Sequence, residues 1–211
     1  MILAIALALQ AQTALPAPRF ENEVARFEAA DRRRMPPRDA VLFVGSSTIE
    51  RWPDLKSDFP SVEVIQRGIG STRLDDFVRF APRIVIPYHP RLIVLYAGDN
   101  DFADGQSARN VYEDFKDFVR VVHRALPNAR IVFVSVKPSP SRWHLASRMR
   151  KTNALVRGYV KRDRRLKYVD VFNAMIGPNG HPTPALFVDD SLHMTPAGYK
   201  LWTRILHPTV K

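Results

Sequence analysis

Five short apolar segments separated by helical patterns constrain the fold of this 211-residue chain more than any other feature. They are rich in Val, Ile and Leu and mostly lack the polar alternation of a half-exposed strand. Such segments are typical of parallel strands that are covered on both faces. We therefore predict an α/β domain with a mostly parallel five-stranded sheet and helices on both faces. The predicted strands span residues 41–44, 62–65, 92–96, 131–136 and 168–171.

Three amphipathic segments predict helices that pack against this sheet. Apolar residues recur every three or four positions in residues 111–122, and again in the strongly basic residues 145–160. The last helix is predicted to begin with Thr195 as its N-cap and Pro196 at its first position. Its apolar stripe is expected to be core, and consists of Tyr199, Trp202, Ile205 and Leu206.

Polar residues follow each of the first three predicted strands. Ser47 follows the first strand, Ser71 the second and Asn100 the third. Open parallel sheets bind ligands at the carboxyl ends of their strands, so these side chains are expected to converge on one edge. The proline-containing loop 137–141 after the fourth strand has two open interpretations, a rim of this site or a turn only.

These residues match the groups that are needed for acyl transfer through a covalent serine ester. Ser47 requires a base, and His193 is the only one of the six histidines with a carboxylate three residues before it. Asp190 and Asp189 are the two carboxylates that compete to orient its ring. The candidate oxyanion donors are the side chain of Asn100 and the backbone N–H groups of Ser47 and Ser71.

Other kinds of site are not supported by the sequence. The chain has no cysteine, which excludes disulfides and thiol catalysis. Gly68-x-Gly70 is followed by Arg73 where a dinucleotide fingerprint requires glycine, and no P-loop or G-x-S-x-G elbow is present. No cluster of His, Asp and Glu has metal-ligand spacing, so we predict neither a cofactor nor a metal.

The net charge of +11 is compatible with anionic lipid head groups or an acidic glycan. The basic residues are spread along the chain apart from runs at 32–34 and 161–165, and no nucleic-acid-binding motif is present, so no nucleic-acid partner is expected. No stretch approaches the roughly 18 apolar residues of a membrane-spanning helix.

The N-terminal residues 1–15 are predicted to be either a signal peptide or an apolar tail, and residues 16–211 one domain. A signal peptide would place the protein in the periplasm or outside the cell. Without one, a cytoplasmic location is expected.

Four blocks in order resemble the SGNH (GDSL-like) hydrolase family, over roughly Val41 to Trp202. The resemblance implies a flavodoxin-like three-layer α/β/α sandwich and ester hydrolysis without metal or cofactor. It also favours Asp190 over Asp189, because the spacing to His193 matches the final block of the family. The blocks are Gly45-Ser46-Ser47, Arg67-Gly68-Ile69-Gly70-Ser71, Gly98-Asp99-Asn100-Asp101 and Asp190-x-x-His193.

Two residues depart from the family pattern. Ser46 stands where the usual block has Asp, and Ser71 stands where it has the oxyanion Gly. We predict a serine esterase with the triad Ser47, His193 and Asp190 that hydrolyses short-chain, above all acetyl, esters of small molecules, glycans or lipids. The alternatives are a lysophospholipase or lipase-type esterase and a catalytically silent ligand-binding member of the fold.

Overall fold

The computed structural model describes residues 19–211, so the predicted signal peptide or tail at residues 1–15 lies outside the described part. Five strands form one sheet in the order β2-β1-β3-β4-β5, and every neighbouring pair is parallel. This confirms the predicted α/β class and the parallel sheet. The strands are β1 (Val41–Gly45), β2 (Val64–Gly68), β3 (Leu92–Tyr96), β4 (Arg130–Val134) and β5 (Leu166–Val169).

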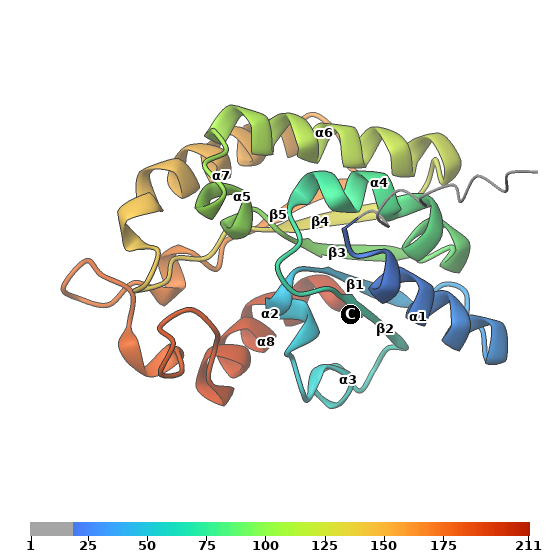
Figure 1. Cartoon of the computed structure of the whole chain (residues 1–211), viewed down its shortest axis with the longest axis horizontal. Helices are drawn as coiled ribbons and strands as arrows, with labels where there is room; N and C mark the ends of the chain where they lie inside the picture. The colour runs from blue at the N-terminus through green and yellow to red at the C-terminus, as the bar shows by residue number, and fades with distance from the viewer. Residues whose placement is uncertain (1–18) are drawn as a thin grey trace, which may run out of the picture.

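Helices cover both faces of the sheet and give three layers (Figure 1). One face carries α1 (Glu21–Arg33), α4 (Leu74–Ile84), α6 (Ala108–Ala125) and α7 (Ala146–Val160). The other face carries α2 (Ser47–Glu50), α3 (Leu55–Asp58) and α8 (Pro196–Val210). The remaining helix is α5 (Asp99–Ala103), and 3-10 turns lie at Ile86–Tyr88, Trp143–Leu145, Asn173–Met175 and Pro184–Leu186.

The two covered faces explain why the strand segments lack polar alternation. Leu42 and Val44 of β1 pack into the core beneath α4 and α6, whereas Val41 and Phe43 pack into the core beneath α8. Successive side chains of a strand point to opposite faces, so a strand with two buried faces needs an apolar residue at every position.

Strand β2 lies two to three residues later than predicted, at 64–68 instead of 62–65. Its polar residues are paired by tertiary contacts that the local pattern does not show. Gln66 Nε2 donates to the carbonyls of Ile49 and Trp52, at 2.7 and 3.1 Å. Arg67 forms an ion pair with Asp31 of α1, which makes a polar edge strand stable.

The predicted start of the last helix is confirmed. Thr195 Oγ1 accepts a hydrogen bond from Gly198 N at 3.3 Å, and Pro196 is the first residue of α8. Tyr199, Trp202 and Leu206 are buried as expected, whereas Ile205 is only partly buried.

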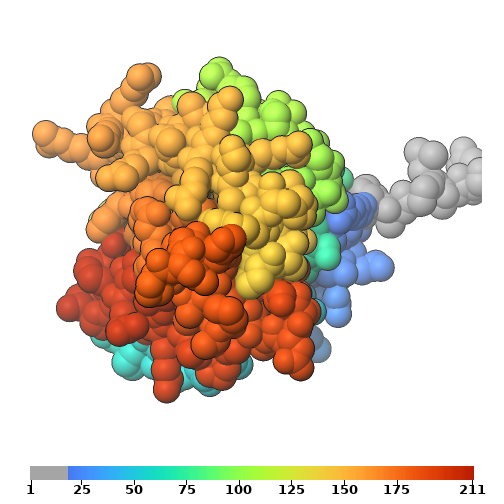
Figure 2. Space-filling view, turned by 90° about the vertical axis from the view of Figure 1, so that its left-hand side faces the viewer, coloured from blue at the N-terminus to red at the C-terminus, as the bar shows by residue number. Residues whose placement is uncertain are grey.

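The strand order fixes where a site can form. The chain passes from β1 to β2 on one side and then to β3 on the other, so the order switches at β1. The edge where the strands end faces the viewer in Figure 2, and there the yellow and orange surface of the segment around α7 borders the red-orange segment before α8. Within residues 19–211, no helix is both long and apolar enough to span a membrane.

Candidate active site

Ser47 lies on a sharp turn between β1 and α2. β1 ends at Gly45, and Ser47 is already the first residue of α2. The turn is held by the backbone of Ser46, whose N–H donates to Tyr96 O at 3.1 Å and whose carbonyl accepts from Ile49 N at 2.9 Å. The buried Ser46 hydroxyl has no hydrogen-bond partner within residues 19–211. Ser46, which stands where the family pattern has Asp, therefore forms no side-chain hydrogen bond that stabilises the turn.

Two glycines let the backbone elements meet at this turn. A Cβ on Gly45 would lie 2.2 Å from Tyr96 O, and a Cβ on Gly68 would lie 2.1 Å from the Glu50 amide nitrogen. Any larger residue at either position would push α2 away from the sheet and displace the Ser47 hydroxyl.

The structure brings Ser47, His193 and Asp190 into one hydrogen-bonded chain. Ser47 Oγ lies 3.0 Å from His193 Nε2, and His193 Nδ1 lies 2.5 Å from Asp190 Oδ2. If Nδ1 carries the proton and donates to the carboxylate, the Nε2 lone pair faces the Ser47 hydroxyl. This arrangement can remove a proton from Ser47 as its oxygen attacks a carbonyl carbon.

The Asp190 carboxylate is fixed by its own loop. Its Oδ1 accepts from the backbone N–H groups of Leu192 and His193, both at 2.9 Å. Partial burial pushes the pKa of Asp190 upward, but the His193 ring and these two amides outweigh it and hold the pKa well below its ordinary value. The carboxylate therefore stays ionised beside the ring. Asp189 makes no hydrogen bond or ion pair to His193 in the described part of the chain.

Asn100 is bonded to the loop of Ser71, which follows β2 beside the end of β1. Asn100 Nδ2 donates to Thr72 O at 2.9 Å, so the second hydrogen of the amide is available to an oxyanion. Ser71 has φ of +61°, the left-handed region where glycine is free of strain. The Ser47 N–H belongs to the first turn of α2, where amides have no partner within the helix.

A second bond ties α5 to the start of α4. The buried Asp101 carboxylate accepts from Leu74 N at 3.1 Å. Burial raises the pKa of Asp101 to about 7, although the Leu74 amide opposes the shift. Asn100 and Asp101 therefore hold the loop of Ser71 at the end that leads into α4.

Lys137 contacts both the loop of His193 and the start of α5, which contains Asn100. Its side chain was not singled out in the sequence analysis. Its ammonium donates to the carbonyl of Leu192, directly before His193, at 3.0 Å. It also lies 3.5 Å from Oδ2 of Asp99, directly before Asn100. The side chain is 1% exposed. Burial lowers the pKa of Lys137, although the Asp99 carboxylate opposes the shift.

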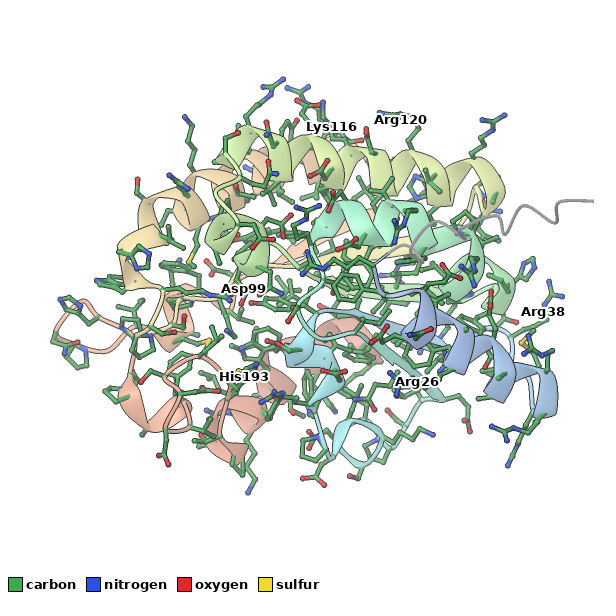
Figure 3. The ribbon with its side chains drawn as sticks, in the orientation of Figure 1. Arg26, Arg38, Asp99, Lys116, Arg120 and His193 are labelled. Carbon is green, nitrogen blue, oxygen red and sulfur yellow. The ribbon has the colours of Figure 1, made fainter. Side chains whose placement is uncertain are left out.

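Arg142 is the second cation on Asp99, with Nη1 3.1 Å from the same oxygen. Its neighbour Ser141 donates its backbone N–H to Ser191 O at 3.1 Å. Loop 137–141 thus contacts the loop of His193, in agreement with its interpretation as a rim. The position of Lys137, directly after a predicted strand, was the available signal. Figure 3 shows Asp99 and His193 at the same end of the molecule, with Arg38 at the opposite end.

No group of three or more metal-ligating side chains occurs within residues 19–211.

Comparison with known proteins identifies the family of this chain and relatives of its fold. Residues 40–201 match the model of the GDSL-like Lipase/Acylhydrolase family. The platelet-activating factor acetylhydrolase IB subunit alpha1 of Bos taurus is 25% identical over 190 residues, which cover 86% of this chain and 78% of the bovine protein.

Two solved structures share the fold. A GDSL-like lipase from Bacteroides thetaiotaomicron superposes with a TM-score of 0.75 at 21% identity, covering 89% of this chain and 96% of the lipase. A carbohydrate esterase of family 3 from Talaromyces cellulolyticus superposes with a TM-score of 0.65 at 16% identity, covering 81% and 95%.

Proposed function

The chain belongs to the GDSL-like lipase/acylhydrolase family and is an ester hydrolase, and from this premise we propose a Ser-His-Asp mechanism in which Ser47 is the nucleophile. The observation that carries the proposal is the continuous chain from Ser47 Oγ through His193 to Asp190.

In the first half-reaction Ser47 Oγ attacks the ester carbonyl carbon while His193 Nε2 accepts the hydroxyl proton. The ionised Asp190 stabilises the imidazolium that forms. Asn100 and the N–H groups of Ser47 and Ser71 donate to the oxygen that becomes negative. His193 then protonates the leaving alcohol, and an acyl-Ser47 ester remains.

In the second half-reaction water attacks the acyl-Ser47 carbonyl while His193 accepts one of its protons. The same donors stabilise the second tetrahedral intermediate. His193 returns the proton to Ser47 Oγ as the carboxylic acid leaves, so the enzyme is regenerated without net proton uptake.

We propose short acyl groups, acetyl above all, as the substrate class. The bovine relative is named as an acetylhydrolase. Ser71 has a hydroxymethyl group where the usual block has glycine, and we expect this group to narrow the space beside the oxyanion donors. Long acyl chains need an apolar surface, and the large hydrophobic residues exposed within residues 19–211 are Met35 and Val188 only.

A series of p-nitrophenyl esters from acetyl to palmitoyl tests this function. We expect kcat/KM to be highest for acetyl and to fall with chain length, and Ser47→Ala to abolish turnover of every ester. A higher kcat/KM for palmitoyl than for acetyl would identify a lipase-type enzyme. Absence of turnover for all esters would favour the silent ligand-binding alternative.

A further inference from the structure

The net charge of the chain comes from one continuous segment. Residues 118–162 hold 11 of the 32 Lys and Arg residues and none of the 21 Asp and Glu residues. The remainder of the chain therefore has 21 of each and no net charge. The charged segment includes the second half of α6, β4, loop 137–145 and all of α7. Six of the eleven cations lie on α7 or directly after it, so this helix carries a local excess of positive charge.

A groove of about 340 Å³ lies on this side, between α7 and the end of β5. Three cationic side chains line it, Arg150, Arg157 and Lys161, and all three residues are exposed. The one carboxylate in its wall belongs to Asp170, which accepts from Asn173 Nδ2 at 2.7 Å. The groove is therefore concave and carries an excess of positive charge.

The three cations of the groove form no ion pair with any carboxylate of residues 19–211. Cations elsewhere in the chain do: Arg165 lies 2.5 Å from Asp163, and Arg83 lies 2.6 Å from Glu28. Like charges on adjoining turns repel each other, and a bound anion relieves that repulsion. The groove is suited to a ligand with several negative charges.

The groove adjoins the candidate active site through loop 137–145. The Arg150 guanidinium lies 4.4 Å above the Phe172 ring and 5.9 Å from the centre of the Trp143 ring. Trp143 directly follows Arg142, which pairs with Asp99 beside Asn100. Phe172 and Asp170 follow β5 at the same edge of the sheet where Ser47 follows β1. The groove and Ser47 therefore lie at the same edge of the sheet.

We propose that this groove binds the carboxylate groups of an acidic polysaccharide, and that an acyl ester on the same polysaccharide is cleaved at Ser47. The inference rests on the esterase function proposed above and adds the class of substrate. A membrane surface fits the groove less well, because neither of the exposed large hydrophobic residues within residues 19–211, Met35 and Val188, lines it.

The test compares a groove variant with a variant of equal charge change. The groove variant is Arg150→Glu/Arg157→Glu/Lys161→Glu. The matched control is Arg33→Glu/Arg38→Glu/Lys200→Glu, whose three residues are exposed and lie outside the groove. Binding of oligogalacturonate is measured at low and high salt, and acetate release is measured from O-acetylated polygalacturonate and from p-nitrophenyl acetate.

We expect the groove variant to lose about tenfold or more in oligogalacturonate affinity and the matched control less than about twofold, with weaker binding at high salt. The groove variant is also expected to lose more kcat/KM on the polysaccharide than on p-nitrophenyl acetate. Equal losses in both variants, or tighter binding of phosphatidylglycerol vesicles or duplex DNA than of oligogalacturonate, would overturn the inference. Failure of the wild type to hydrolyse p-nitrophenyl acetate would contradict the proposed esterase function instead.

Discussion

Replacement of Lys137 by Met tests whether the buried ammonium positions the catalytic groups. Methionine fills a similar volume but removes the bond to Leu192 O and the ion pair with Asp99. Breaking a buried ion pair by removing one partner costs about 3–5 kcal/mol. Because Arg142 remains 3.1 Å from the same carboxylate oxygen, we expect a loss at or just below the lower end of this range, about 2–3 kcal/mol.

The effect on rate follows from the position of the hydrogen bond between the Lys137 ammonium and Leu192 O. Leu192 O is one residue before His193, so its release loosens the backbone that aims the imidazole at Ser47. Misplacement of a catalytic group by about 1 Å costs about a hundredfold in rate, so we expect kcat for p-nitrophenyl acetate to fall about 10- to 100-fold. KM should change little, because the Lys137 side chain is buried and not accessible to a bound ester.

The pH profile gives a readout that lost packing alone would not change. Loss of the ammonium removes one positive charge from beside the Asp99 and Asp190 carboxylates, so the surroundings of His193 become more negative. A more negative environment favours the protonated imidazolium, which is inactive as a base. The acid limb of kcat/KM should therefore move to higher pH in Lys137→Met.

Arg142→Met is the matched control, because it removes the other cation on Asp99 and leaves the bond to Leu192 O intact. Urea unfolding and steady-state kinetics are measured on both variants. The reasoning is refuted if both variants lose kcat equally. It is also refuted if Lys137→Met is destabilised but keeps kcat within about threefold of the wild type.

Three further substitutions test the oxyanion donors and the carboxylate beside them. Asn100→Ala should lower kcat about a hundredfold or more with little change in KM, and kinetics equal to the wild type would mean that Asn100 is a turn residue only. Ser71→Gly keeps the N–H group and relieves the positive φ, so acetyl ester hydrolysis should persist and urea unfolding should show a gain of up to about 1 kcal/mol. The folded pKa of Asp101 lies above its unfolded value, so this residue destabilises the fold increasingly as pH rises from about 4 to about 7. Asp101→Asn should therefore stabilise the protein more at pH 8 than at pH 5, by roughly 2–3 kcal/mol as an upper bound, and an equal effect at both pH values in thermal melts would contradict this.

The fold was predictable because its determinants are local in the sequence. Short apolar segments encode strands buried on two faces, and Thr195-Pro196 encodes the start of α8. The position of β2 was not predictable from the same pattern. Its residues Gln66 and Arg67 are paired by partners 14 to 36 residues away, and no hydrophobic period records those contacts.

The candidate site was predictable where its residues follow directly after strands. Ser47, Ser71 and Asn100 were placed by that rule, and His193 by its spacing from Asp190. The role of Lys137 was not predictable, because it depends on a bond to a residue 55 positions away. The basic residues are spread along the chain, but the net charge is not. The net charge is concentrated in residues 118–162 because this segment has no carboxylate, and not because its cations form a run.

The central claim is that Ser47 is an activated nucleophile, and covalent labelling tests it most directly. The wild type and Ser47→Ala are incubated with a fluorophosphonate, and the intact mass and the modified peptide are determined by mass spectrometry. The account predicts one adduct on the wild type, located at Ser47, and none on Ser47→Ala. A folded wild type that remains unlabelled, or equal labelling of Ser47→Ala, would contradict it.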